Sequence, residues 1–210
     1  MADEETIRVY DTKATDYAKR FSRDEPSGSL KGFMSCLPPG AAVLDWGCGP
    51  GMASSHLRDA GFLPDPVDAS PEMVALAREH QGLPARLGTF DDPLEKAAYQ
   101  GVWANFSLLH AERTDFPGHL ANLHDCLQPQ GILHLGMKRG SGANRDKFGR
   151  YYTFYETEEL ATLLQAAGFE ILKVHEGEEA GLAGTVDPFV LMLSRKTQVP
   201  VSREKETSAI

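Results

Sequence analysis

A short apolar run that ends in a glycine-rich turn constrains the fold of this chain more than any other feature. Residues 41–45 are apolar up to Asp45 and lie between turn signals, the pattern of a strand buried on both faces of a parallel sheet. The turn at 47–51, Gly-Cys-Gly-Pro-Gly, follows at once. Glycines permit unusual backbone angles and, lacking Cβ, let a ligand lie against the main chain. The segment therefore predicts either a nucleotide-binding loop or a bare strand-to-helix turn.

The rest of the chain alternates strand and helix patterns, as βαβ repetition does. Two late apolar runs, 169–174 and 189–193, have no helical pattern between them, so they should pair as an antiparallel hairpin. The sequence therefore predicts an α/β fold with a mostly parallel sheet. Periodicity and turn signals predict helices over about 5–20, 30–37, 52–60, 70–82, 120–127 and 160–167, and strands near 62–68, 85–90, 101–107 and 132–137.

Two prolines interrupt the strand near 62–68. Pro64 and Pro66 lie two apart, so both missing N–H groups face the same side of the strand, and one neighbour loses two hydrogen bonds. We expect the regular part of this strand to be short, nearer 66–68.

Length and composition exclude several classes of protein. A chain of 210 residues suits one α/β domain, here 1–196, followed by a polar and flexible tail at 197–210. The net charge of −9 disfavours nucleic-acid binding, because it repels a polyanion. Three dispersed cysteines fit neither a disulfide framework nor a metal site and favour the cytoplasm. The acidic N-terminus and the lack of a long apolar segment predict neither export nor membrane anchoring.

A carboxylate after the next strand narrows the choice of ligand. Asp68 lies 21 residues beyond Gly47, close to the ~20-residue interval at which an acid meets ribose hydroxyls. A dinucleotide loop needs a third glycine where this chain has Met52. Asp45 precedes the glycines, and an acid there suits an ammonium group better than a phosphate. S-adenosylmethionine, which carries an ammonium and no phosphate, therefore fits better than a nicotinamide dinucleotide.

Residues 43–51 and 67–73 together resemble the first and second motifs of the class I (Rossmann-like) S-adenosylmethionine-dependent methyltransferases, and the resemblance extends over about 10–196. It implies a seven-stranded sheet with helices on both faces, strand order 3-2-1-4-5-7-6 and a reversed, antiparallel last strand. It also implies an N-terminal helical lid over about 5–24 and S-adenosylmethionine as the cofactor.

The same resemblance implies where the sugar and amino-acid parts of the cofactor bind. Asp45 and the backbone of Gly47, Cys48 and Gly49 would hold the methionine end. Asp68 would accept both ribose hydroxyls.

The resemblance also implies contacts to the adenine and the sulfonium. Ala69, Thr89 and Phe90 would border the adenine, although members of the family commonly have an acid where this chain has Thr89. Asn105 ends a strand and would line the sulfonium. Tyr17, in the lid, either contacts the ligand or packs within its helix.

His110 is the candidate catalytic residue. It is the only histidine at a strand end that faces the predicted site, and its ordinary pKa suits a general base for a hydroxyl acceptor. The alternative is a loop histidine that only caps or packs.

The segment 138–150 carries five positive charges against one negative and follows a predicted strand, so it lies at the same edge of the sheet as the cofactor. Its glycines predict a mobile segment over the pocket. Arg139 and Arg150, with Tyr151 beside them, would bind an anionic acceptor. Alternatively, the segment is a solvated loop whose charges pair with the acidic surface.

The function that these patterns favour is S-adenosylmethionine-dependent methylation of a small-molecule acceptor, which is anionic if the segment 138–150 binds it. A tRNA-modifying methyltransferase and a nonenzymatic S-adenosylmethionine-binding scaffold are the alternatives, and a nicotinamide oxidoreductase is the least favoured. The patterns specify neither the acceptor nor an oligomeric state.

Overall fold

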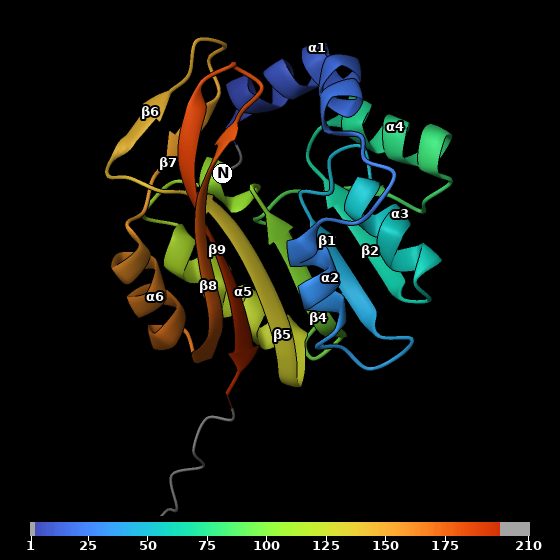
Figure 1. Cartoon of the computed structure of the whole chain (residues 1–210), viewed down its shortest axis with the longest axis vertical. Coiled ribbons are helices and arrows are strands. Elements are labelled where there is room, and N and C mark those ends of the chain that lie inside the picture. The colour runs from blue at the N-terminus through green and yellow to red at the C-terminus, as the bar shows by residue number, and fades with distance from the viewer. Residues whose placement is uncertain (1–2, 198–210) are drawn as a thin grey trace, which may run out of the picture.

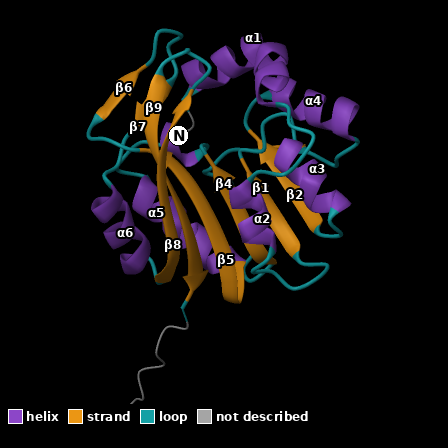
Figure 2. Cartoon of the chain, in the orientation of Figure 1, coloured by secondary structure: helices purple, strands orange, loops and turns teal. Residues whose placement is uncertain are grey.

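The computed structural model describes residues 3–197, and its centre is a twisted sheet with helices on both faces (Figures 1 and 2). The predicted tail at 197–210 lies outside the described residues except for Thr197. The helices are α1 (Glu4–Phe21), α2 (Gly28–Met34), α3 (Met52–Asp59), α4 (Pro71–Gln81), α5 (Phe116–Cys126) and α6 (Thr157–Ala166), with a 3-10 turn η1 (Leu108–His110). The strands are β1 (Ala42–Trp46), β2 (Leu63–Asp68), β3 (Arg86–Leu87), β4 (Tyr99–Asn105), β5 (Leu127–Lys138), β6 (Ala143–Arg145), β7 (Tyr151–Thr153), β8 (Phe169–Ala180) and β9 (Val186–Lys196).

The strand order of the main sheet is β3-β2-β1-β4-β5-β9-β8. Strands β1 to β5 pair in parallel, whereas β9 runs antiparallel to both β5 and β8. The short strands β6 and β7 form a separate hairpin. With that hairpin set aside, the order is the predicted 3-2-1-4-5-7-6 with the last strand reversed, so the fold prediction is confirmed.

The prediction of a short second strand is wrong, because β2 pairs with β1 from Leu63 to Val67, through both prolines. Leu63 donates its N–H toward the β1 side (3.0 Å), and the carbonyl of Asp68 accepts from the β3 side (3.0 Å). Successive residues of a strand direct their backbone groups to opposite sides. Pro64 and Pro66 therefore face the same side as Asp68. There β3 pairs only with the last two residues of β2, so the prolines face a stretch without a neighbouring strand.

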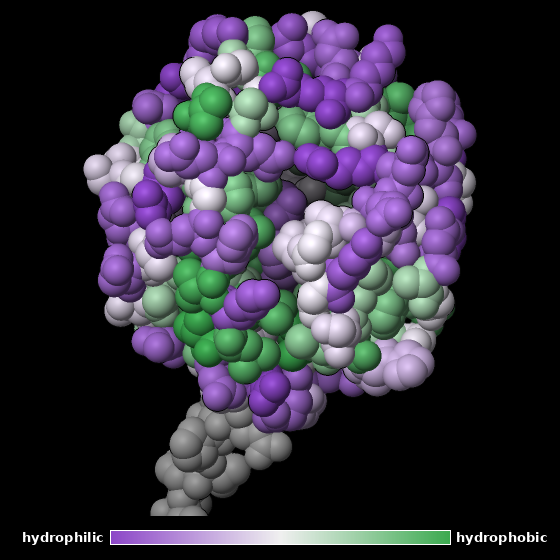
Figure 3. Space-filling model, in the orientation of Figure 1, coloured by the Kyte–Doolittle hydropathy of each residue, from purple (hydrophilic) through white to green (hydrophobic). Residues whose placement is uncertain are grey.

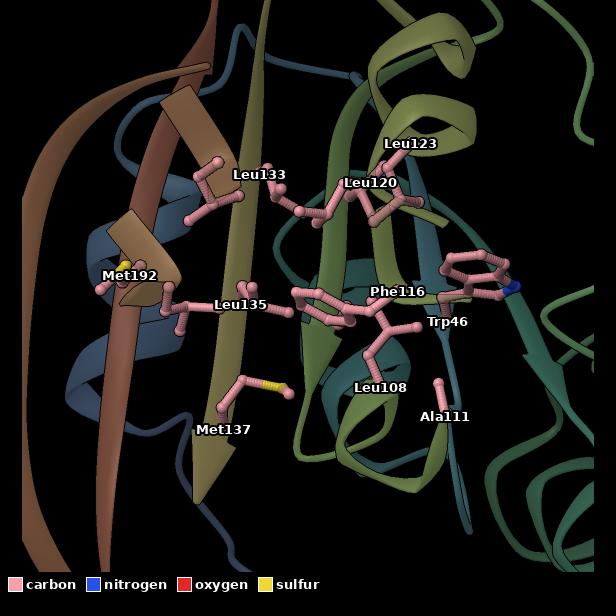
Figure 4. Close-up of a cluster of buried hydrophobic side chains, with 14 of the residues drawn as sticks. Trp46, Leu108, Ala111, Phe116, Leu120, Leu123, Leu133, Leu135, Met137 and Met192 are labelled. Atoms are coloured by element: carbon pink, nitrogen blue, oxygen red, sulfur yellow. The ribbon is translucent and has the colours of Figure 1, made fainter. Parts of the chain in front are cut away.

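The main hydrophobic core lies between the sheet and helices α5 and α6. Phe116, Leu120 and Leu123 point from α5 toward Leu133 and Leu135 of β5, and all five are fully buried (Figure 4). A second cluster packs α2 and α3 against the opposite face of β1 and β4. The sheet is thus held on both faces, which fixes the positions of its strand ends.

Helix α1 lies above the carboxyl ends of the strands, with the β6–β7 hairpin and the tip of β8–β9 at the same edge (Figure 1). Asp11 of α1 accepts the Ser70 hydroxyl at the start of α4 (2.5 Å). Asp3, before α1, pairs with Arg145 of β6 (2.7 Å). The segment 138–150, expected to be mobile, thus contains a strand of an ordered hairpin. Within 3–197, none of the helices is both long and apolar enough to cross a bilayer.

The packing of α5 predicts a large difference between two leucines. Leu120→Ala should lower the free energy of unfolding by about 2 to 5 kcal/mol, because the side chain is fully buried and its removal leaves a cavity. Leu63→Ala, at a position 65% exposed, should change it by less than about 0.5 kcal/mol. Urea unfolding of both variants measures the contrast, and equal losses would contradict the assigned core.

Candidate functional site

Two cavities meet at the carboxyl edge of the sheet. The larger, about 830 Å³, lies between α1, α2 and the β8–β9 hairpin, and the smaller, about 100 Å³, lies between α1 and the ends of β1 and β2. Figure 3 shows a hollow near the centre of the face of the molecule that it draws. The residues that line both cavities are Tyr10, Tyr17, Gly47, Gly49, Asn105 and Phe106.

The glycine turn after β1 has a backbone that only glycine adopts easily. Gly47 and Gly49 have φ of +82° and +54°. A Cβ at Gly47 would lie 2.3 Å from the Cβ of Ser107, so this glycine lets the end of β4 pack against the turn. A Cβ at Gly49 would meet only the Tyr17 ring, at 3.7 Å. The space in front of Gly49 is therefore available to a ligand, and Tyr17 of α1 bounds it.

Asp68 lies at the end of β2 and lines the smaller cavity. Its Oδ2 accepts the Gly49 N–H (2.8 Å) and its Oδ1 accepts the Ser70 N–H (2.9 Å). Burial raises the pKa of this carboxyl, and the backbone N–H groups oppose that rise. A carboxylate has about four lone-pair sites, so Asp68 keeps acceptor capacity for a ribose hydroxyl beside these backbone groups. The donor set therefore fits the sugar of S-adenosylmethionine.

Asp45 lies at the end of β1 and lines the larger cavity, which Cys48 lines as well. Burial raises the pKa of Asp45 to about 7, and the Ser54 hydroxyl, which donates to Oδ2 (2.7 Å), opposes the rise. A bound ammonium would favour the ionised carboxylate further. The position and charge of Asp45 fit the methionine end of the cofactor.

The predicted adenine contacts divide into two groups. Ala69 and Phe90 line the smaller cavity. Thr89 lines neither cavity; its N–H donates instead to Oδ2 of Asp92 (2.9 Å). The smaller cavity, at about 100 Å³, lies below the ~300–1,000 Å³ of pockets for small organic ligands. Residues of helix α1 line it, so an outward shift of α1 would widen it.

The surroundings of His110 do not favour the base predicted from the sequence. Its Nδ1 lies 2.5 Å from the Tyr151 carbonyl, which only accepts, so Nδ1 carries the proton. Nε2 then accepts the Tyr10 hydroxyl (2.8 Å). Burial, aided by the charges of Arg150 and Lys138, lowers the pKa of His110 to about 4. The ring is thus neutral near pH 7, and both nitrogens hold the surrounding structure together.

The predicted anion-binding residues do not come together. Arg150 is buried and lines the larger cavity, but its Nε and Nη2 donate to Asp146 (3.0 and 2.6 Å) and its Nη1 donates to the Tyr10 hydroxyl (3.1 Å). Arg139 lines neither cavity and pairs with Glu176. Tyr151 also points away, and its hydroxyl donates to Glu112 (2.8 Å).

Asn105 lines both cavities, as its predicted place beside the sulfonium requires. Sequence reasoning missed His134 and Lys138, which lie four residues apart on β5 and line the larger cavity. Their even spacing puts both side chains on one face of the strand, and that spacing was the available signal. Tyr152, whose ring lies under the Lys138 ammonium, also lines this cavity.

Comparison with known proteins places the chain among methyltransferases. A family model described as a methyltransferase domain matches residues 13–174. The malonyl-[acyl-carrier protein] O-methyltransferase of Enterobacter lignolyticus is 33% identical over 109 residues, which cover 50% of this chain and 43% of that protein. An uncharacterized methyltransferase of Synechocystis sp. is 28% identical over 153 residues, covering 66% of this chain and 71% of its own.

A solved structure has the same fold. It is the Burkholderia thailandensis 1,6-didemethyltoxoflavin-N1-methyltransferase with bound 1,6-didemethyltoxoflavin and S-adenosylhomocysteine, which superposes with a TM-score of 0.72 at 23% identity and covers 93% of this chain and 88% of that one. The match to the Enterobacter protein spans less than half of that protein's length.

The hydrogen bonds of Asp68 predict a loss of ligand binding. Asp68→Ala should weaken S-adenosylhomocysteine binding by more than about tenfold, because hydrogen bonds to a charged group contribute about 1.5 to 3 kcal/mol each. Asp65→Ala is the matched control, since Asp65 lies on the same strand, pairs with Arg86 and lines neither cavity. Calorimetric titration measures both. A loss below about threefold at Asp68 in a folded variant would exclude the ribose contact.

The raised pKa of Asp45 predicts pH-dependent binding. Below about pH 7 the carboxyl is protonated in the free protein and no longer attracts an ammonium. Affinity for S-adenosylhomocysteine should therefore fall by up to about tenfold as the pH is lowered from about 8 to about 6. Asp45→Asn should bind weakly across that range and lose this dependence. Titrations at a series of pH values test the assignment, and a flat wild-type profile would contradict it.

Proposed function

The chain belongs to the methyltransferase domain family, as a class I S-adenosylmethionine-dependent member, and on that premise we propose that it methylates a small-molecule acceptor bound in the larger cavity. The observation that carries the proposal is the meeting of the two cavities at Gly47, Gly49 and Asn105. The cofactor's sulfonium belongs at this junction, between its ribose at Asp68 and its ammonium at Asp45. A nucleophile in the larger cavity can approach the junction directly.

Bound S-adenosylmethionine supplies an electrophilic methyl group, so the protein has to align the acceptor and exclude water. Asp45 and Asp68 fix the two ends of the cofactor. Tyr10, Tyr17 and Phe106 surround the junction with aromatic rings and shield it from solvent. None of these steps requires a general base if the acceptor is already anionic or is a thiolate.

The walls of the larger cavity favour an acceptor with an apolar body and a negative group. Phe189, Leu191 and Leu193 of β9 are partly exposed and line its wall. Lys138 lines the same cavity, with its Nζ 2.7 Å from Asp187. An ammonium has three N–H donors, so Lys138 can donate to an acceptor anion while it keeps its contact with Asp187. The volume of about 830 Å³ lies within the ~300–1,000 Å³ of pockets for small organic ligands.

The charge pairing supports a small molecule over tRNA. Arg139, Arg145 and Arg150 each form an ion pair with an acid of this chain, which leaves little free positive charge on the 138–150 segment for a phosphate backbone. The net charge of −9 acts in the same direction.

An activity screen tests the proposal. Purified protein and S-adenosylmethionine are incubated separately with a malonyl thioester, 1,6-didemethyltoxoflavin, a set of other carboxylates, phenols and amines, and unmodified tRNA, and release of S-adenosylhomocysteine is measured. Methylation of at least one compound supports the proposal. Tight cofactor binding without turnover on any compound would favour the nonenzymatic scaffold, and turnover only on tRNA would favour the alternative enzyme.

Lys138 gives the sharpest test of an anionic acceptor. Lys138→Gln should raise the acceptor KM by about tenfold and leave S-adenosylhomocysteine affinity within about twofold, since Asp45 and Asp68 hold the cofactor. Arg139→Gln, the adjacent charge outside the cavity, should change neither constant. Steady-state kinetics of both variants provide the measurement. Equal effects at the two positions, or a best acceptor that is neutral, would refute the anionic acceptor.

A further inference from the structure

His134 is a buried histidine that lines the larger cavity beside its junction with the smaller one. It lies on β5, where the parallel register sets it next to Trp103 of β4. The two rings stack with centroids 3.8 Å apart and planes 13° apart, and the residue is 3% exposed. A polar ring held this closely needs a partner for its N–H group.

That partner is the side-chain amide of Asn105. His134 Nε2 lies 3.0 Å from Asn105 Oδ1. An amide oxygen only accepts, so Nε2 carries the hydrogen and donates it. Burial lowers the pKa of His134 to about 3, which keeps the ring neutral, so its Nδ1 carries no proton. With Oδ1 rather than Nδ2 of the amide facing Nε2, the pair has the Nε2–H tautomer of the histidine.

A glycine makes this contact possible. Asn105 pairs in register with Gly136, and a Cβ at Gly136 would lie 2.6 Å from Asn105 Oδ1. Without that Cβ, the amide lies against Gly136 and reaches His134 on the same strand. Since Oδ1 is directed at His134, the other half of the amide, Nδ2, is directed away from it, on a side chain that lines both cavities.

We infer that His134 is a positioning residue that fixes the Asn105 amide with its NH₂ group toward the junction, where it donates to an oxygen atom of the methyl acceptor. The inference rests on the proposed transfer at this junction and extends it to a substrate class. The acceptor carries a carbonyl or carboxylate oxygen at, or next to, its nucleophilic atom. A site that offers a fixed donor in this way rejects analogues that lack the matching oxygen.

Three substitutions separate this role from packing. In His134→Gln the amide nitrogen occupies the place of Nε2, and in His134→Asn it occupies the place of Nδ1. His134→Phe keeps an aromatic ring against Trp103 and removes both nitrogens. Each variant is checked by thermal unfolding and by S-adenosylhomocysteine titration, which should stay within about twofold of wild type.

The first experiment needs no acceptor. Nitrogen-15 spectra of the S-adenosylhomocysteine complex should show His134 as the neutral Nε2–H tautomer down to about pH 5. The side-chain amide signals of Asn105 should shift in the Phe and Asn variants and stay near their wild-type positions in the Gln variant. An Nδ1–H tautomer, or Asn105 signals that respond equally to all three variants, would overturn the inference.

The second experiment measures turnover of a malonyl thioester, whose carboxylate offers the required oxygen. We expect kcat to fall by at least about tenfold in His134→Phe and His134→Asn, with recovery to within about threefold of wild type in His134→Gln. Equal kcat losses in the Gln and Phe variants would overturn the inference and leave only packing. If the wild-type protein methylates only acceptors without such an oxygen, the substrate class is wrong. If it methylates nothing, the proposed function fails, and the spectra still decide the orientation of Asn105.

Discussion

The close approach of the β1 turn to the end of β4 is the constraint on which the site depends. Ser107 occupies the space that any side chain at position 47 would need, so the two central strands end side by side only because residue 47 is glycine. Its neighbour Gly49 then presents an N–H to Asp68, which joins the turn to the end of β2. Three strand ends are thereby held in one arrangement before any ligand binds, which is the preorganisation that alignment of two reactants requires.

Much of the fold was predictable because its signals are local. Ser70, Pro71 and Gly82 mark the two ends of α4, and the structure caps that helix as they indicate. The order of the strands came from the family resemblance, since periodicity contains no information on which strands are neighbours. The error at β2 has the same origin. Two prolines disrupt a strand only if a neighbour needs their missing N–H groups, and the sequence does not reveal that β3 stops short of them.

The sequence predicts the positions of the acids and glycines of the site well. It predicts the roles of the basic residues and histidines much less well. Asp45 and Asp68 lie in the last two residues of β1 and β2, so their position at the sheet edge follows from the strand pattern alone. The role of Arg145 depends on its ion pair with Asp3, which lies 142 residues away in the sequence. The role of Arg150 depends on its local pair with Asp146. His134 looked like a residue inside a strand, because its partner Asn105 is brought to it only by the register of β4 against β5.

The contacts between α1 and the β6–β7 hairpin join a helix that lines both cavities to a segment that lines the larger one. Arg145 binds Asp3, the Tyr151 N–H donates to the Thr6 hydroxyl, and Arg150 donates to Tyr10, so the helix and the hairpin are joined at several points. Any displacement of α1 that admits an adenosine must either break these contacts or carry the hairpin with it. Arg150 and Tyr152 of that segment form part of the wall of the larger cavity. A shift of α1 would therefore change the walls of both cavities together, because Tyr10 and Tyr17 line both of them.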